Sequence, residues 1–268
     1  MTSNAPTPSH ALPLTAPGQV TLVGAGPGDP ELLTLKAARA ISEATVLLVD
    51  DLVNDTVLVH AAPGVRIVQV GKRGGCKSTP QAFICKLMIE AARAGEVVVR
   101  LKGGDPFIFG RGGEEVEELA AAGIPVSVVN GITSGLAAVS SLNLPLTHRE
   151  HAHGVIFVTG HAKPGDAGTD WAALARCAQQ ARLTLVIYMG VSSAESIQAG
   201  LLQGLPGTTP AAIVQRATLP QQRHAACTLA TLIETLRAEG LGSPSILIVG
   251  DVLQGLLRLQ SRPQALAA

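Results

Sequence analysis

The chain has 268 residues, enough for one large or two ordinary α/β domains. Its 20 basic and 20 acidic residues balance, 47% of its residues are hydrophobic and 2% are aromatic. This composition indicates a well-buried globular protein and argues against a nucleic-acid binder, which needs a basic surface or base-stacking aromatic residues. The apolar runs have the length of strands, so no transmembrane helix and no membrane partner are predicted.

The start of the chain predicts a disordered tail. Residues 1–17 are rich in Pro, Ser and Thr and lack the basic start and apolar core of a signal peptide. Four cysteines show no metal-ligand spacing and are expected to be reduced thiols, which favours a cytoplasmic location. They are Cys76, Cys85, Cys177 and Cys227.

The first half of the chain alternates strand and helix patterns. A strand, a Gly-rich turn and a helix are expected over residues 20–35. Further strands are expected at 44–50, 65–71, 96–101 and 124–131, and helices at 79–95, 114–123 and 132–142. Such alternation predicts a parallel sheet with helices on both faces.

The segment LPLTHREHAHG (144–154) interrupts this rhythm and predicts a domain junction. A second βα series follows, with strands expected at 155–160, 184–190, 210–218 and 244–252 and helices near 194–202 and 231–239. The expected fold class is α/β: two α/β domains, 18–145 and 146–259, with a cofactor cleft between them and a tail at 260–268.

The stretch RLKGGDPFIFGRGGEE (100–115) is the strongest candidate for a binding site. It runs from a β-branched strand through five glycines into a helix with an acidic first turn. Ligands of open α/β sheets bind where a strand ends and such a loop begins. We therefore expect a ligand here rather than a solvated connector.

The turn GAGPGDP (24–30) raises an alternative function. Its glycines resemble a dinucleotide-binding turn, and Asp50 ends the second expected strand, where such a fold places its ribose-binding acid. This leaves a nicotinamide-dependent oxidoreductase or a non-catalytic nucleotide-binding module open. The third glycine comes one residue early, however, and Pro27 removes an N–H group that would face a pyrophosphate.

Basic residues gather at expected strand ends and at the junction, which predicts a positive cleft for an anionic small molecule. These residues are Lys72, Arg73, Arg100, Lys102, Arg111, His148, Arg149, His151 and His153. His148, His151 and His153 could suggest a metal, but we expect no Cys, Asp or Glu to complete a ligand shell, which favours surface or substrate-facing histidines and no metal.

Six motifs together, VGAGPGDPELLTL, VGKRGG, RLKGGDPFIFGRGGEE, GIT, LPLTHR and YMG, resemble the uroporphyrinogen-III C-methyltransferases in order and spacing from about Val20 to Val252. The resemblance implies a tetrapyrrole methyltransferase-like fold with two α/β domains, distinct from an ordinary Rossmann methyltransferase. It also implies a homodimer that uses S-adenosyl-L-methionine as co-substrate.

The resemblance also implies roles for particular residues. Asp50 and Lys72 match a proton acceptor and a proton donor, and Arg111, Glu114 and Arg149 match polar groups on the tetrapyrrole side. The cofactor-binding positions are Pro27, Gly103, Gly104, Asp105, Ile108, Thr133, Ser134, Met189 and Ala217.

The implied reaction places two methyl groups on C2 and C7 of uroporphyrinogen III, giving precorrin-2 via precorrin-1 for sirohaem, cobalamin or haem d1. A methyltransferase of the same class acting on a later corrin intermediate is a further alternative, disfavoured by the intact GRGGEE and LPLTHR motifs. The chain departs from the family pattern at Asp51, Asn130 and Gln215 and in the run GLAA after Ser134.

Overall fold

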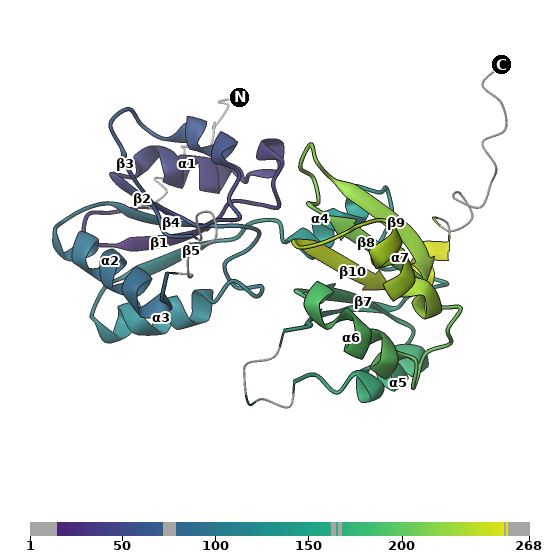
Figure 1. Ribbon diagram of the computed structural model, residues 1–268. Coiled ribbons are helices and arrows are strands. Elements are labelled where there is room, and N and C mark those ends of the chain that lie inside the picture. The colour runs from purple at the N-terminus through teal and green to yellow at the C-terminus, as the bar shows by residue number, and fades with distance from the viewer. Residues whose placement is uncertain (1–14, 72–78, 162–164, 166–167, 255, 257–268) are drawn as a thin grey trace, which may run out of the picture. The chain divides into compact units, whose positions relative to one another are not determined.

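The computed structural model describes residues 15–71, 79–161, 165, 168–254 and 256, and it divides into two compact units (Figure 1). The first comprises the chain up to Gly26 and Pro30–Gly131, and the second comprises Pro27–Asp29 and the chain from Ile132 onward. We expected the junction near residue 145. The observed division falls earlier because helix α4 (Ser134–Ser140) packs on two strands of the second unit, β7 (Leu183–Tyr188) and β10 (Ser245–Val249).

The first unit is built on a parallel sheet with strand order β3-β2-β4-β1-β5. Each strand falls where an apolar, β-branched run predicted one. The strands are β1 (Val20–Gly24), β2 (Val46–Val49), β3 (Arg66–Gln69), β4 (Val98–Lys102) and β5 (Val126–Val129). The carboxyl ends of all five strands therefore lie along one edge of the sheet.

Helices cover both faces of this sheet, as predicted (Figure 1). On one face α2 (Gln81–Arg93) and α3 (Gly112–Ala121) bury Met88 and Leu119 against Leu22 and Leu48. On the other face lie α1 (Leu35–Glu43) and two short 3-10 helices, η1 (Pro30–Leu32) and η2 (Asp55–His60). The sheet is therefore packed between two layers of helices, which fix the position of the carboxyl ends of its strands.

The second unit has a mixed sheet with strand order β6-β7-β10-β8-β9. Besides β7 and β10 it contains β6 (Gly154–Thr159), β8 (Pro210–Gln215) and β9 (Arg223–Thr228). Only β6 and β7 pair in parallel, and the remaining pairs are antiparallel. The expected βα series is therefore correct for the first two strands, whereas β8 and β9 form a hairpin-like pair.

One face of this sheet is covered by α5 (Trp171–Ala181), α6 (Ala194–Leu201) and α7 (Leu232–Ala238), whose apolar side chains pack on Leu185 and Ile213. The 3-10 helices of this unit are η3 (Val191–Ser193), η4 (Leu229–Thr231) and η5 (Asp251–Leu253). Neither α5 nor β9 was predicted.

Three further expectations concern membrane helices, the cysteines and the N-terminal tail. None of the helices in the described part of the chain combines the length and apolarity that a membrane crossing requires. Cys85, Cys177 and Cys227 are free thiols, and Cys76 lies outside the described residues. Of the expected N-terminal tail, Thr15 is buried and donates a hydrogen bond of 2.7 Å to Glu43.

Candidate functional site

Three strand ends of the first unit meet at glycines. After β4 the chain turns back at Gly104, whose N–H donates to the carbonyl of Gly26 at 2.7 Å and whose carbonyl accepts the N–H of Gly26 at 3.2 Å. A Cβ on Gly24 would lie 2.5 Å from the nitrogen of Gly131 and 2.6 Å from the carbonyl oxygen of Gly104. Only glycine permits backbones to approach this closely, so the Gly-rich turns serve to bring three loops together.

Asp105 joins two of these loops. One carboxylate oxygen accepts the N–H of Phe107 at 2.8 Å, and the other accepts the N–H of Gly131 and the side-chain amide of Asn130, each at 3.1 Å. Asp105 is buried, so these bonds are partly shielded from water. Asn130, one of the departures from the family pattern, thus supplies a donor that proline would lack.

Arg111 presents its guanidinium at the surface from an unusual backbone conformation. Its φ is 59°, in the left-handed region, and a Cβ on neighbouring Gly110 would lie 2.7 Å from the carbonyl oxygen of Pro106. The side chain donates two hydrogen bonds from Nε at 3.1 and 3.2 Å and one from Nη2 at 2.5 Å to Glu114. These hydrogen bonds raise the pKa of Arg111, so its charge is retained at all physiological pH values.

The same segment, residues 100–115, also contains three buried charged side chains, those of Arg100, Lys102 and Glu115. Arg100 and Lys102 project from β4 toward α3, where Glu115 Oε1 accepts Arg100 Nε at 3.2 Å and Lys102 Nζ at 3.1 Å. The side chain of Gln81 at the start of α2 donates to the same oxygen at 2.9 Å. The exposed fractions of Arg100, Lys102 and Glu115 are 1%, 3% and 0%. Burial, followed by the charge of Arg100, lowers the pKa of Lys102, and Glu115 opposes the shift.

The predicted positive cleft is therefore wrong for Arg100 and Lys102. Both are shielded from solvent and form ion pairs with Glu115, so neither is available to an anionic ligand. Arg100 instead reaches the edge of the sheet, where Nη2 donates to Asp50 Oδ2 at 3.3 Å. Asp50 directly follows β2, accepts the N–H of Asp51 at 3.0 Å and keeps 37% of its side chain exposed.

In the second unit, Tyr188 organises the candidate cofactor residues at the start of α4. Its hydroxyl forms a 2.6 Å hydrogen bond with Thr133 Oγ1 and accepts the N–H of Gly135 at 2.7 Å. Ser134 begins α4 beside Thr133, and Met189 follows Tyr188 with φ at 52° and an exposed side chain. Tyr188 is not among the predicted site residues, although it directly precedes Met189 in the YMG motif.

Ala217 and Pro27 lie near each other in the second unit. Ala217 is buried between Arg216 and Thr218, which both have positive φ. The segment Pro27–Asp29 joins this unit, and the N–H of Asp29 donates to Thr218 Oγ1 at 3.0 Å. The cofactor candidates thus form two groups, with Gly103, Gly104, Asp105 and Ile108 in the first unit and the others in the second.

The histidine segment forms a tight turn. His148 and Ala152 form an isolated bridge, and the ligating atoms of His148, Glu150 and His151 lie within 4.8 Å of one another. His148 Nδ1 accepts the N–H of Glu150 at 3.2 Å, so one of the two ring nitrogens of His148 is already used. Arg149 is exposed on this turn, and Lys72 lies outside the described residues.

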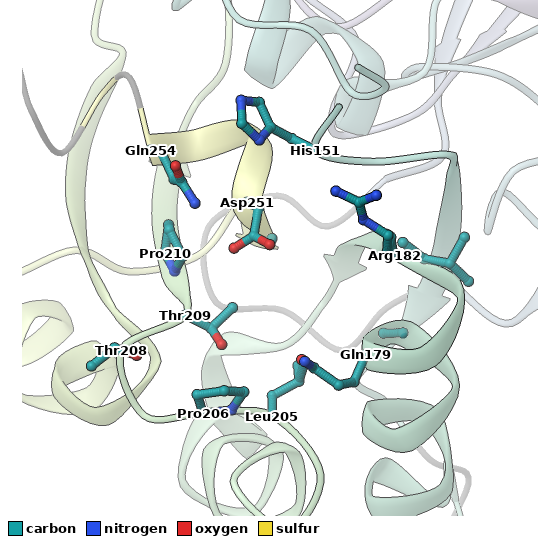
Figure 2. Close-up of a pocket in the computed structure, with 13 residues that line it drawn as sticks. His151, Gln179, Arg182, Leu205, Pro206, Thr208, Thr209, Pro210, Asp251 and Gln254 are labelled. Carbon is teal, nitrogen blue, oxygen red and sulfur yellow. The ribbon is translucent and has the colours of Figure 1, made fainter. Parts of the chain in front are cut away.

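A hollow of about 620 Å³ lies elsewhere in the second unit, among Arg182, Thr209 and Asp251 (Figure 2). It is lined by the first residues of β7 and β8, Leu183 and Pro210. Met189 and Ala217 follow the last residues of these same strands. The hollow is thus at the opposite end of the sheet from the candidate cofactor residues, and none of those residues lines it.

Comparisons with known proteins give one consistent result. Residues 19–233 match the family of tetrapyrrole (corrin/porphyrin) methylases. The chain is 52% identical over 252 residues to a uroporphyrinogen-III C-methyltransferase of Pseudomonas aeruginosa, covering 94% of this chain and 99% of the relative. It is 49% identical over 237 residues to siroheme synthase 2 of Aeromonas hydrophila, covering 88% of this chain but only 49% of the length of that relative.

Among solved structures, the chain resembles uroporphyrin-III C-methyl transferase of Thermus thermophilus, determined in complex with S-adenyl homocysteine. The TM-score is 0.73 and the identity 44%, with 88% of this chain and 99% of the other covered. Family match, whole-length identity and fold agree, and the chain therefore belongs to the tetrapyrrole (corrin/porphyrin) methylases.

Proposed function

We propose that this chain transfers two methyl groups from S-adenosylmethionine to C2 and C7 of uroporphyrinogen III, giving precorrin-2 via precorrin-1. The observation that carries the proposal is the 52% identity over almost the whole length of a uroporphyrinogen-III C-methyltransferase. Family membership removes the basis of the nicotinamide alternative, since the GAGPGDP turn (24–30) that suggested it lies within residues 19–233, which match the methylase family.

The candidate cofactor residues fit a nucleoside with a sulfonium side chain. In the first unit, Gly103 and Gly104 carry no side chain and Ile108 is apolar, and in the second unit the exposed Met189 adds an apolar side chain. The bound co-substrate supplies an electrophilic methyl group whose departure leaves a neutral thioether. The remaining work of the protein is to align the ring carbon with that methyl, and such alignment contributes on the order of 7–11 kcal/mol to lowering a barrier.

Exposed arginines are suited to the substrate, which carries eight carboxylates. Arg111 keeps its planar guanidinium at the surface and Arg149 lies on the exposed histidine turn. Planar guanidinium groups bind carboxylates through two parallel hydrogen bonds. We assign Arg111 to substrate binding, with Glu114 orienting it. Arg149, which the family resemblance places on the tetrapyrrole side, lies on the turn before β6 with His151, at the end of the second sheet away from Met189 and Ala217.

Methylation of a pyrrole carbon leaves positive charge on the macrocycle, and a proton must then leave it. The sequence left open whether a carboxylate or an arginine accepts this proton. Because Glu114 raises the pKa of Arg111, the structure disfavours Arg111 as the acceptor. Asp50 has a partly exposed carboxylate at the edge of the sheet, and we assign the acceptor role to it, with Lys72 as the donor.

The test is to incubate the purified protein with methyl-labelled S-adenosylmethionine and uroporphyrinogen III and to identify the product by mass. We expect two labelled methyl groups per macrocycle and no binding of NAD in a parallel calorimetric titration. A single methyl group, or activity only on a later corrin intermediate, would assign the chain to another member of the family.

We also propose that the chain acts as a homodimer in the cytoplasm, as its resemblance to the family implies. Light scattering on the purified protein should give twice the mass of the chain. Its product is a precursor that sirohaem, cobalamin or haem d1 synthesis consumes.

A further inference from the structure

Glu115 has a combination of properties that packing alone does not require. Its side chain is fully buried, and one oxygen accepts hydrogen bonds from Gln81, Arg100 and Lys102. Within the described part of the chain, the second oxygen has no hydrogen-bond partner. Leaving a buried carboxylate oxygen without a donor is unfavourable, which marks Glu115 as a candidate for a role beyond core filling.

The chain of contacts from Glu115 leads to the proposed proton acceptor. Glu115 contacts Nε of Arg100, and the Nη1 of the same guanidinium donates to the carbonyl of Leu101 at 3.1 Å. These contacts leave Nη2 directed at Asp50 Oδ2, 3.3 Å away. A guanidinium is rigid and planar, so fixing two of its nitrogens determines where the third one lies.

The charges of this group also balance. Arg100 and Lys102 are cations, and Glu115 and Asp50 are carboxylates, so the four side chains sum to zero. Without Glu115, two buried cations would face Asp50 alone. Arg100 would then be drawn further toward the edge of the sheet, because Asp50 would be its remaining ionic partner.

We propose that Glu115 is a positioning residue for methyl transfer: through Arg100 it holds the carboxylate of Asp50 in the orientation that removes a proton from the methylated ring. The proposal rests on the proposed function and adds to it a residue that makes no contact with substrate. A purely structural Glu115 would affect folding and leave the chemistry of the folded enzyme unchanged.

The test is a double-mutant cycle between Glu115→Gln and Asp50→Asn, with Glu117→Gln as the control. Glu115→Gln keeps the shape of the side chain and removes its charge, and Glu117 is an exposed residue of the same helix. We expect Glu115→Gln to lower kcat at least tenfold while the KM values for the tetrapyrrole and S-adenosylmethionine change less than threefold. Glu117→Gln should match the wild type.

In the Asp50→Asn background, Glu115→Gln should lower kcat less than twofold further, because the residue through which it acts is already lost. An equal loss in both backgrounds would overturn the proposal, and so would an unchanged kcat in the single variant. Single-turnover measurements at high enzyme concentration give the rates of the slow variants.

Arg100→Lys provides a second cycle with Asp50→Asn if Glu115→Gln fails to fold. Failure of both variants to fold would assign the buried group to stability alone and overturn the proposal. If the wild-type protein methylates no uroporphyrinogen III, the proposed function fails. A wild type that does methylate it, combined with an additive cycle, contradicts only the role of Glu115.

Discussion

Glu114 and Glu115 are neighbours in the first turn of α3, and each pairs with an arginine from the RLKGGDPFIFGRGG segment. Glu114 binds Arg111 where both side chains are about half exposed, whereas Glu115 binds Arg100 where both are buried. Two ion pairs of the same chemistry, one residue apart, thus lie in opposite environments.

The difference shows how one segment separates structure from recognition. Water screens the outer pair, so it contributes little to stability, and the guanidinium of Arg111 that Glu114 orients stays accessible to a substrate carboxylate. The inner pair cannot exchange partners, because breaking it leaves an uncompensated charge in the core. A buried strand residue, Arg100, and an exposed residue directly before the helix, Arg111, together with two successive residues in the first turn of α3, produce the two environments.

The largest expected effect tests the inner pair. Glu115→Ala leaves the charges of Arg100 and Lys102 buried without their carboxylate, and we expect the free energy of unfolding to fall by about 3–5 kcal/mol. Urea denaturation followed by circular dichroism measures it. Glu117→Ala on the exposed side of the same helix is the control and should change stability by less than about 0.5 kcal/mol. A fall of less than about 1 kcal/mol in the unfolding free energy of Glu115→Ala would mean that water reaches the side chains of Arg100 and Lys102.

Asp105 extends the comparison to a buried carboxylate that is held by amide groups instead of cations. Asp105→Ala leaves two N–H groups and the Asn130 amide without their acceptor, and we expect a loss of about 1.5–3 kcal/mol in stability. Affinity for S-adenosylmethionine, measured by calorimetry, should fall as well, because the loop that ends β4 loses its link to Gly131. Unchanged affinity combined with lower stability would make Asp105 a purely structural residue.

The first unit could be predicted from the sequence because its strands are continuous β-branched runs separated by clear helix patterns. The second unit was predicted less completely. The strand β9, with the sequence RHAACT, contains few β-branched residues and exposes its first two, so it shows no apolar run. Helix α5 is rich in alanine, and its pattern was overlooked even though Asp170 is a good N-cap whose side chain accepts the N–H of Ala173.

At the site, the sequence predicted which loops matter but misjudged two of the charges. The position of Arg100 and Lys102 at a strand end predicts ligand-binding cations, which is wrong because both side chains are buried. The sequence also contains a signal for the opposite conclusion. Arg100 and Lys102 lie on the same face of β4 as Val98, since they are two and four residues further along the strand. Glu115 lies in the first turn of the next helix, α3, which packs on that face. The pairing itself is tertiary and cannot be derived from spacing.

Arg111→Lys tests whether the outer pair serves recognition. Lysine keeps the positive charge but lacks the planar fork, so we expect methyl transfer to fall at least roughly tenfold, which equals about 1.4 kcal/mol. Affinity for S-adenosylmethionine should remain near that of the wild type. Turnover and cofactor affinity are measured on one preparation, and normal turnover would reduce Arg111 to a surface charge.

The smallest expected effect concerns the stability of the outer pair and sharpens the contrast with the inner one. Glu114→Gln removes an exposed ion pair, and we expect the free energy of unfolding to fall by only about 0.2–1 kcal/mol. Raising the ionic strength from about 0.01 M to about 1 M shortens the Debye length from about 30 Å to about 3 Å, so the difference in unfolding free energy between Glu114→Gln and the wild type should nearly vanish.

Glu115→Gln is the matched comparison, since the same change made one residue later should destabilise the protein to a similar extent at both salt concentrations. An effect of Glu114→Gln that persists at high salt would show that Glu114 also holds the left-handed backbone of Arg111 in place, which screening does not weaken.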